Sequence, residues 1–348
     1  MGGSPGVVTA QSPNDSRAGQ AWRVAGRLLL AVVGLALVVY LVHGAGPERV
    51  VRVIWQARAW LPVAVALELF QLCSDFFTLR MLLGDRKSDV PVATWVRSSA
   101  IAYAMMILVP AGRAAGEVTR ATLVAKHVGA ARAATASAQL QSAYVFAIAL
   151  WSAIECVVVA TRLGVRAPLG LLLGANTLLM MTLSAGLLAI LWDARVGHWL
   201  EGLRSRFVRS ARQPPLEPSV RRRLPWQAAG LCSLSRTAQV VQYAVILRAV
   251  GGIPTVRSTL IAHGIHLVGT TLGDVLPNGL GVVDGAYRTF AANVGFGDSP
   301  ARALSIAFVA HLSQLMVATA SLLVLALSRR SAPGGSAPHA SEGARNPI

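Results

Sequence analysis

Two stretches of this chain run for longer than a bilayer is thick without a single Asp, Glu, Lys or Arg. They are Ala167–Trp192, with 26 residues, and Ala303–Leu327, with 25 residues. About 20 apolar residues in a helix are enough to cross the hydrocarbon core of a membrane. Over the whole chain 54% of the residues are hydrophobic and only 14% are charged, which is not the balance of a soluble domain. The sequence therefore predicts an all-α, polytopic integral membrane protein.

The hydropathy pattern predicts a single transmembrane domain over residues 24–327, in two halves near 24–160 and 167–327. Each half contains three full spans and one shorter apolar piece. The tails, 1–23 and 331–348, are rich in Gly, Pro, Ser and Ala, and we expect both to be disordered. The full spans lie near 24–43, 59–83, 133–160, 167–192, 224–250 and 303–327, and the short pieces near 92–111 and 256–277.

The net charge of +17 does not indicate a nucleic-acid partner, because the arginines lie in loops between apolar spans. Eight of them crowd the loop Arg195–Arg223. This is the positive-inside pattern that orients membrane proteins, and it also attracts anionic lipid headgroups. No Walker loop, GxSxG or HExxH motif is present, and the three cysteines lie in apolar spans without a CxxC pair. We therefore expect no cofactor, no metal site and no internal ATP drive.

Charge counting separates two topologies for the short pieces. If both cross the membrane and the termini lie outside, the inside loops hold 17 Lys and Arg and the outside regions hold 13. If both are re-entrant and the termini lie inside, the numbers are 21 and 9. The positive-inside rule favours the re-entrant topology over eight spans. With three crossings in each half, the second half would begin on the opposite side of the membrane, as in an inverted repeat.

Both short pieces end at matching interruptions, in which an apolar residue is followed by Pro, any residue and Gly. An acid, Glu117 or Asp284, follows each proline by seven positions. Broken backbone at membrane depth is tolerated only where it is buried in protein or lines a wet cavity. A matched pair of such breaks points to a substrate site at the interface between internal repeats.

The first interruption lies at Pro110 and Gly112. Proline lacks a backbone donor and glycine permits unusual dihedral angles, so the helix should end here and a new one should start near Arg113. The free N–H groups and the positive dipole end of that helix could bind a phosphate. Arg113 and Arg120 could add charge-assisted hydrogen bonds. Glu117 lies on the same helical face and could hold both guanidinium groups or exchange a proton.

The second interruption has similar backbone breakers, Pro277, Gly279 and Gly281. Asn278 tolerates left-handed or capping geometry. Asp284 precedes Arg288 by four positions, which is the favourable order for an ion pair on a helix. Asp274 adds a third acid just before the break. A capped helix with one ordinary ion pair is the alternative to a binding site here.

At these residues the chain resembles the lysylphosphatidylglycerol synthase transmembrane, or flippase-like, family. The first stretch matches a family signature through Pro110, Arg113, Gly116, Glu117 and Arg120. The second matches another signature through Pro277, Gly279 and Gly281, with Asn278 in place of the usual Gly and Asp284 in place of the usual Glu. The resemblance spans about 24–327 and implies that the protein moves or presents lipids, often lipid-linked intermediates of envelope synthesis.

The resulting hypothesis is a lipid transporter of the cytoplasmic membrane that binds a phosphate-bearing lipid, anionic or polyprenyl-phosphate-linked. Glu117, Arg120, Asp284 and Arg288 would line its cavity. Two alternatives remain. The protein could be a membrane enzyme acting on a lipid-linked substrate, with Glu117 or Asp284 as the general base. It could also be a non-catalytic membrane partner of an envelope glycosyltransferase or another envelope-synthesis protein.

Further polar residues lie within the predicted spans. Ionisable groups at that depth usually face the interior and pair with one another, so we interpret them first as interhelical contacts. The same interpretation, hydrogen bonding between helices rather than metal binding, applies to the histidines. The set comprises Glu68, Asp75, Glu155, Arg236, Gln239, His263, His266, His311 and Gln314.

Overall fold

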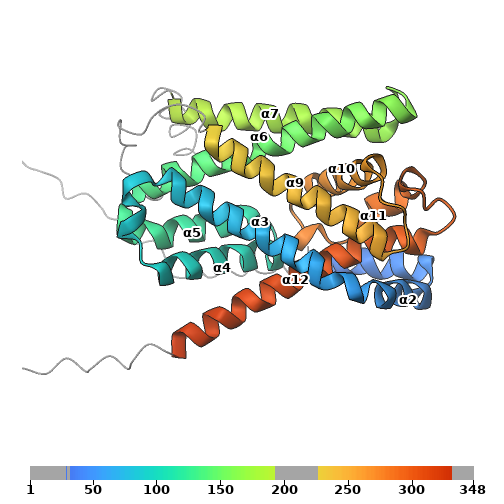
Figure 1. The fold of residues 1–348 in the computed structure, drawn as a ribbon, viewed down its shortest axis with the longest axis horizontal. Coiled ribbons are helices and arrows are strands. Elements are labelled where there is room, and N and C mark those ends of the chain that lie inside the picture. Colours follow the sequence, from blue (N-terminus) through green and yellow to red (C-terminus); the bar gives the residue numbers. More distant parts are fainter. Residues whose placement is uncertain (1–28, 30–31, 193–225, 331–348) are drawn as a thin grey trace, which may run out of the picture.

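The computed structural model describes residues 29, 32–192 and 226–330, and these residues form helices and no strand. The predictions for the two tails and for the arginine-rich loop fall outside the described residues. The transmembrane helices that position the site are α3 (Leu61–Leu82), α6 (Ala130–Leu163), α7 (Pro168–Trp192), α9 (Trp226–Ala249) and α12 (Pro300–Arg330). They run along the long axis of the molecule (Figure 1).

The prediction of an all-α, polytopic membrane protein is confirmed. Within the described residues, four helical stretches are long and apolar enough to span a membrane: Pro47–Leu82, Ala130–Leu163, Pro168–Ala189 and Pro300–Leu327. Helix α9, with 24 residues, is not one of these four stretches. It carries buried polar side chains such as Arg236, Gln239 and Gln242. The first predicted span is described from Val32 to Ala45, as a shorter apolar helix.

One helix lies where the sequence indicated only a loop. Helix α2 (Pro47–Ala57) starts with a proline in its first turn, and a short 3-10 turn at Arg58–Trp60 joins it to α3. It buries Val50 and Ala57 while most of its other side chains are exposed. Eleven residues with a narrow apolar stripe are too short and too polar to appear in a search for spans.

Both short apolar pieces form helical hairpins. Helices α4 (Val92–Leu108) and α5 (Gly112–Val128) pack against each other, as do α10 (Val256–Gly273) and α11 (Val282–Thr289). The α4–α5 hairpin lies toward the left end of Figure 1 and the α10–α11 hairpin toward the right end. Each hairpin turns back near the middle of the molecule. This arrangement favours re-entrant segments over eight crossings.

The two halves of the chain pack reciprocally. Helix α4 of the first half contacts α12 of the second, and α10 of the second half contacts α6 of the first. Helix α3 and its counterpart α9 contact each other directly. Each hairpin is therefore held by the last long helix of the other half. The expected inverted repeat would produce such an exchange of contacts, and the repeat itself stays a prediction.

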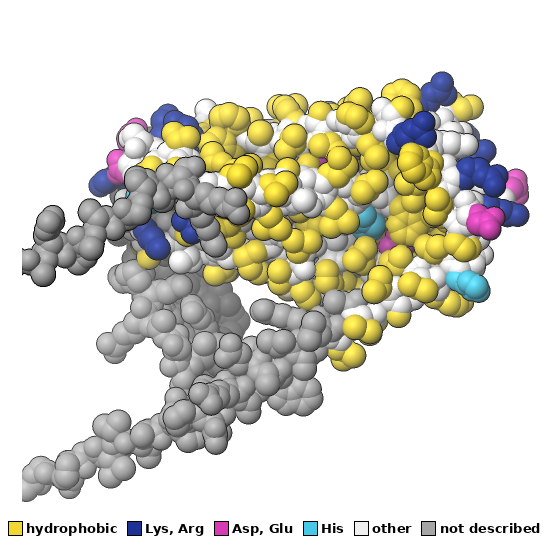
Figure 2. Space-filling model, turned by 90° about the horizontal axis from the view of Figure 1, so that it is seen from below, with side chains coloured by type: hydrophobic (Ala, Val, Ile, Leu, Met, Phe, Trp, Pro, Cys, Tyr) yellow, Lys and Arg dark blue, Asp and Glu magenta, His cyan; other side chains and the backbone are white. Residues whose placement is uncertain are grey.

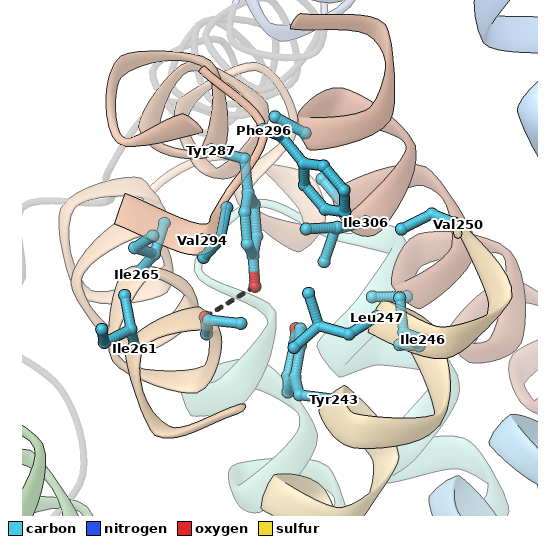
Figure 3. Packing of buried hydrophobic residues seen from close by; sticks show 14 of the residues in the cluster. Tyr243, Ile246, Leu247, Val250, Ile261, Ile265, Tyr287, Val294, Phe296 and Ile306 are labelled. Atoms are coloured by element: carbon cyan, nitrogen blue, oxygen red, sulfur yellow. Dashed lines mark hydrogen bonds between the residues drawn. The ribbon is translucent and has the colours of Figure 1, made fainter. Parts of the chain in front are cut away.

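The apolar side chains form a buried core and an exposed outer face. Inside, a core joins α9, α10, α11 and α12, where Tyr243, Ile246, Ile265 and Ile306 are fully buried (Figure 3). The hydroxyl of Tyr287 donates to the carbonyl oxygen of Ala262 at 2.8 Å in this core. Outside, Figure 2 shows a broad apolar face with Lys and Arg gathered at the two ends of the molecule. This distribution suits a protein surrounded by lipid.

Candidate functional site

A cavity of about 390 Å³ lies between the two breaks. Gly112 and Arg113, at the start of α5, line it from the first hairpin. Leu276, Asn278 and Gly279 line it from the second. Helices α3, α4, α6, α7, α9, α10 and α12 complete the walls. The two interruptions thus meet at one cavity, although 160 residues of sequence separate them.

The first break owes its shape to one strained residue and two closely packed glycines. Helix α4 ends at Leu108, and Ala111 adopts a left-handed conformation with a φ of 51°. A Cβ on Gly112 would lie 2.3 Å from the carbonyl oxygen of Met105, and one on Gly116 would lie 2.5 Å from that of Ala102. The expectation that Gly112 supplies an unusual dihedral angle is therefore wrong. It is a helical residue that lets α5 touch the backbone of α4.

The second break uses the left-handed conformation more heavily. Asn278 has a φ of 51°, and Gly279 and Gly281 have values of 63° and 82°. The backbone N–H of Gly281 donates to Asp284 Oδ2 at 2.8 Å, which caps the start of α11. Asn278 Nδ2 lies 2.8 Å from His311 Nδ1 on α12, which holds the tip of this hairpin against the long helix.

Two arginines reach the cavity and share one aromatic ring. The guanidinium carbon of Arg113 lies 3.6 Å from the ring centroid of Tyr144, and that of Arg236 lies 4.2 Å from it. Arg236 also donates to the Tyr144 hydroxyl oxygen and to Gln239 Oε1. Its Nε is buried without a partner. The ring contacts and hydrogen bonds hold both positive charges at the cavity wall, where they could bind an anion.

Carboxylates share the same cavity. Glu68 accepts hydrogen bonds from the Tyr103 hydroxyl at 2.7 Å and from Gln242 Nε2 at 3.0 Å, so it is held between α3, α4 and α9. Asp75 Oδ1 is buried without a hydrogen-bond partner, and Asp274 is exposed at the rim. The cavity therefore offers hydrogen-bond acceptors beside its two guanidinium groups, and it could hold a headgroup that carries hydroxyl or amino groups as well as a phosphate.

Of the charged residues singled out at the two breaks, Arg113 lines the cavity, whereas Glu117, Arg120, Asp284 and Arg288 lie outside its lining. Glu117 and Arg120 form an ion pair with each other on α5, and the Arg120 side chain is 3% exposed. The predicted Asp284–Arg288 pair is wrong: within the described part of the chain Asp284 faces His311, with Oδ2 and Nε2 3.6 Å apart. Arg288 instead lies against Gly44. Asp284 Oδ2 accepts from the backbone N–H of Gly281, so this carboxylate caps α11 instead of pairing with Arg288.

The remaining signature residues shape the breaks rather than face the cavity. Pro110, Gly116, Pro277 and Gly281 occupy the turns and the helix contacts just described, and none of them lines the cavity. The lining residues that the signatures do contain are Gly112, Arg113, Asn278 and Gly279.

Sequence reasoning missed the uncharged polar partners of the arginines and of Glu68. Tyr103, Tyr144 and Gln242 were not singled out, although each is a polar side chain within an otherwise apolar span and that is the signal that could have found them. The prediction that His263 makes interhelical hydrogen bonds is confirmed, because it contacts Glu155 on α6 and Gln239 on α9. No group of three potential metal ligands lies together among the residues that the structure describes.

Comparison with known families yields one match. The model of the family described as the lysylphosphatidylglycerol synthase TM region matches residues 25–321. No curated protein and no solved structure matches the chain.

Proposed function

Since this chain belongs to the lysylphosphatidylglycerol synthase transmembrane family, we propose that it moves a phosphate-bearing lipid across the membrane or presents it to another protein. Family membership and the apolar helices make it a multi-pass membrane protein of lipid-related function that contacts membrane lipids. The cavity between the two breaks would be the headgroup site.

The observation that carries this proposal is the convergence of Arg113 and Arg236 at the cavity. Two guanidinium groups near Tyr144 create a local positive field, and a guanidinium group matches the geometry of phosphate oxygens. Helix α5 begins at Gly112, so its free N–H groups and positive dipole end lie at the same wall. These features provide a local site for an anionic phosphate beside the carboxyl groups of Glu68, Asp75 and Asp274, which line the same cavity.

The size of the cavity suits a headgroup rather than a whole lipid. Ligand pockets commonly measure roughly 300–1,000 Å³, and about 390 Å³ is enough for a phosphate with a small polar substituent. The acyl or polyprenyl chains would remain in the surrounding bilayer, against the apolar face. Glu68, Asp75 and Asp274 would accept hydrogen bonds from the substituent.

The reciprocal packing of the halves supports a rocking motion. Because each hairpin rests on the last helix of the other half, a tilt of one half would move both breaks together. We place the protein in the cytoplasmic membrane with both termini and the Arg195–Arg223 loop on the cytoplasmic side, following the positive-inside rule. Within this proposal the transmembrane region carries the lipid and does not catalyse a reaction on it.

Lipid scrambling in proteoliposomes tests the proposal. Phosphatidylglycerol and a polyprenyl phosphate, each with a fluorescent label, are reconstituted with the protein, and a membrane-impermeant quencher reports the lipid that reaches the outer leaflet. Wild type should accelerate translocation of at least one of them over empty vesicles. Arg113→Gln should slow it by about tenfold or more, since a charge-assisted hydrogen bond contributes about 1.5–3 kcal/mol.

Arg166→Gln is the matched control, because Arg166 is an exposed arginine in the loop between α6 and α7. It should translocate lipid as fast as wild type. Rates equal to those of empty vesicles for both lipids would contradict the proposal. A new lipid mass formed by the protein would favour the membrane enzyme, and a stable co-purified protein with no effect of Arg113→Gln would favour the non-catalytic partner.

A further inference from the structure

A chain of buried polar side chains leads from the cavity into the core. Arg236 at the cavity wall donates to Gln239 Oε1, and His263 Nε2 lies 3.1 Å from the same oxygen. On its other side, His263 Nδ1 is hydrogen-bonded to Glu155 Oε1. His263 and Glu155 are both completely buried. The chain joins α9, α10 and α6, so it crosses the interface between the two halves.

The donor at each step of this chain can be assigned. An arginine only donates, so the atom of Gln239 that faces Arg236 is its oxygen, which only accepts. His263 must therefore donate to Gln239 from Nε2. Its Nδ1 then either accepts a proton from a neutral Glu155 carboxylic acid or donates one, as an imidazolium, to a Glu155 carboxylate. In both cases the Glu155–His263 pair holds one proton in its hydrogen bond.

The surroundings of Glu155 favour retention of that proton. Its second oxygen, Oε2, is buried next to Gly264 and Leu173 and has no hydrogen-bond partner among the residues that the structure describes. A Cβ on Gly264 would lie 3.1 Å from this oxygen, so only glycine leaves full room for the carboxyl group. An ionised carboxylate with an unpaired oxygen in an apolar core is costly. Loss of the shared proton would also set the carboxylate against the lone pair of Nδ1.

We propose that Glu155 and His263 form a proton-binding site whose occupancy is linked to anion binding at Arg236 in the cavity. The inference rests on the proposed function and adds the ion that drives it. Because the pair joins the last long helix of the first half to the hairpin of the second, its proton stabilises the contact between the halves that must change during transport.

Charge determines the direction of the linkage. Arg236 faces the pair through Gln239, and its positive charge disfavours an added proton on His263. A phosphate that binds Arg236 offsets that charge and can also take over its Nη1 hydrogen bond. The pair therefore binds its proton more tightly when the cavity is occupied. By reciprocity, the phosphate binds more tightly when the pair is protonated, so affinity falls as the pH rises.

Few other titratable groups face the pair. His266 lies one turn along α10, with its ring centroid 6.5 Å from that of His263, and His311 on α12 acts on His266 electrostatically. Tyr243 of α9 contacts the His263 ring edge-on and stacks on Tyr287 of α11. On α6, the neighbour of His263 besides Glu155 is the uncharged Trp151. Arg236 is thus the charged group through which the cavity reaches the pair.

Binding of a short-chain phosphatidylglycerol to the full-length purified protein, measured from acidic to alkaline pH, tests the inference. Its phosphodiester keeps a single charge over this range, so the probe itself adds no pH dependence. Wild-type affinity should fall as the pH rises, by up to about tenfold per pH unit, the limit for one linked proton. Glu155→Gln should bind with an affinity that varies clearly less with pH, because the amide can donate to Nδ1 but cannot lose the proton. The dependence that remains comes from the titratable groups that line the cavity itself.

Glu48→Gln is the matched control, since Glu48 is an exposed acid on α2, and it should keep the wild-type pH dependence. A wild-type affinity that is constant with pH, or a Glu155→Gln variant that keeps the wild-type dependence, overturns the inference while the proposed function stands. If wild type binds neither this probe nor a short-chain polyprenyl phosphate at any pH, the proposed function fails. Infrared difference spectra between acidic and alkaline pH then test the proton site alone. A carboxylic-acid or imidazolium band that changes with pH in wild type and is missing in Glu155→Gln supports the site, and the absence of both bands in wild type overturns it.

Discussion

The two breaks of the chain occupy equivalent positions in the two halves but contribute different chemistry. The first break is a tight turn at Ala111, followed by a 17-residue helix that begins with the cavity residues Gly112 and Arg113. The second has three left-handed residues and an eight-residue helix, and it presents Asn278 and Gly279 to the cavity. The second half supplies its positive charge from α9 instead, through Arg236.

This difference teaches that the two hairpins share a shape but not a set of charges. Both hairpins bring broken backbone to the same cavity, yet the acid that follows each proline serves local structure. Glu117 pairs with Arg120, and Asp284 caps α11. Variants of the packing, the charge, the backbone and the acids can test this difference between the two breaks, from the largest expected effect to the smallest.

The packing of the first hairpin should be the most sensitive feature. Gly112→Ala places a Cβ within 2.3 Å of a backbone oxygen of α4, and neither backbone can yield easily. We expect a loss of about 3 kcal/mol or more, or failure to purify as a monodisperse protein. Gly285→Ala in α11 is the matched control, because a Cβ there meets no atom within 4 Å. Thermal stability by fluorescence-detected size exclusion measures both, and equal tolerance would refute the packing account.

Loss of a positive charge at the cavity should have the second-largest effect. Arg113→Gln and Arg236→Gln should each weaken binding of phosphatidylglycerol by about 10- to 100-fold, since each removes a charge-assisted hydrogen bond to phosphate. Arg288→Gln should change the affinity less than about twofold, because Arg288 does not line the cavity. Equilibrium binding to detergent-solubilised protein makes the comparison. A larger loss from Arg288→Gln would return the binding role to the second signature.

The backbone of the two turns should respond with opposite signs. Ala111→Gly relieves a left-handed alanine and should raise the free energy of unfolding by less than about 1 kcal/mol, because glycine also adds entropy to the unfolded chain. Asn278→Gly keeps the left-handed geometry but removes the hydrogen bond to His311, so it should cost about 1 kcal/mol. Thermal unfolding midpoints distinguish them. Two changes of the same sign would show that the turns are not strained as described.

The acids of the two signatures should matter least for binding. Glu117→Gln leaves an amide oxygen that can still accept from Arg120, and Glu117 is partly exposed, so we expect a cost of about 1 kcal/mol or less. Asp284→Asn keeps an acceptor for the Gly281 N–H. Neither variant should change phosphatidylglycerol affinity by more than about twofold, as measured by the same equilibrium titration. A tenfold loss in either would contradict the assignment of these acids to local structure.

Much of the fold was predictable because hydropathy and charge act over whole helices. The charge-free stretches predicted α7 and α12, and the Pro-x-Gly interruptions predicted where both hairpins turn. The site was harder, because side-chain direction depends on packing between distant segments. Glu117 and Arg120 lie one turn apart on α5, so their pairing follows from spacing. The stacking of Arg113 and Arg236 on Tyr144 joins α5, α9 and α6, and no local spacing encodes it.

The small helix α2 and the buried Glu155–His263 pair illustrate the same limit. An 11-residue amphipathic segment is too short to be recognised as a span from the sequence, and its apolar side packs against α12 and α9 in the fold. Glu155 and His263 each appear as a single polar residue in an apolar span. They lie 108 positions apart in sequence and come into contact because α10 packs on α6.

The central claim is that a phosphate headgroup binds between the two breaks. A phosphatidylglycerol with a photoreactive headgroup, reconstituted with the wild-type protein and crosslinked by light, tests it most directly. Peptide mapping should find the label at the start of α5, around Arg236 on α9 and at residues 274–279, and unlabelled lipid should compete for it. Labelling confined to the lipid-facing surfaces of α7 and α12, undiminished by competition, would contradict the claim.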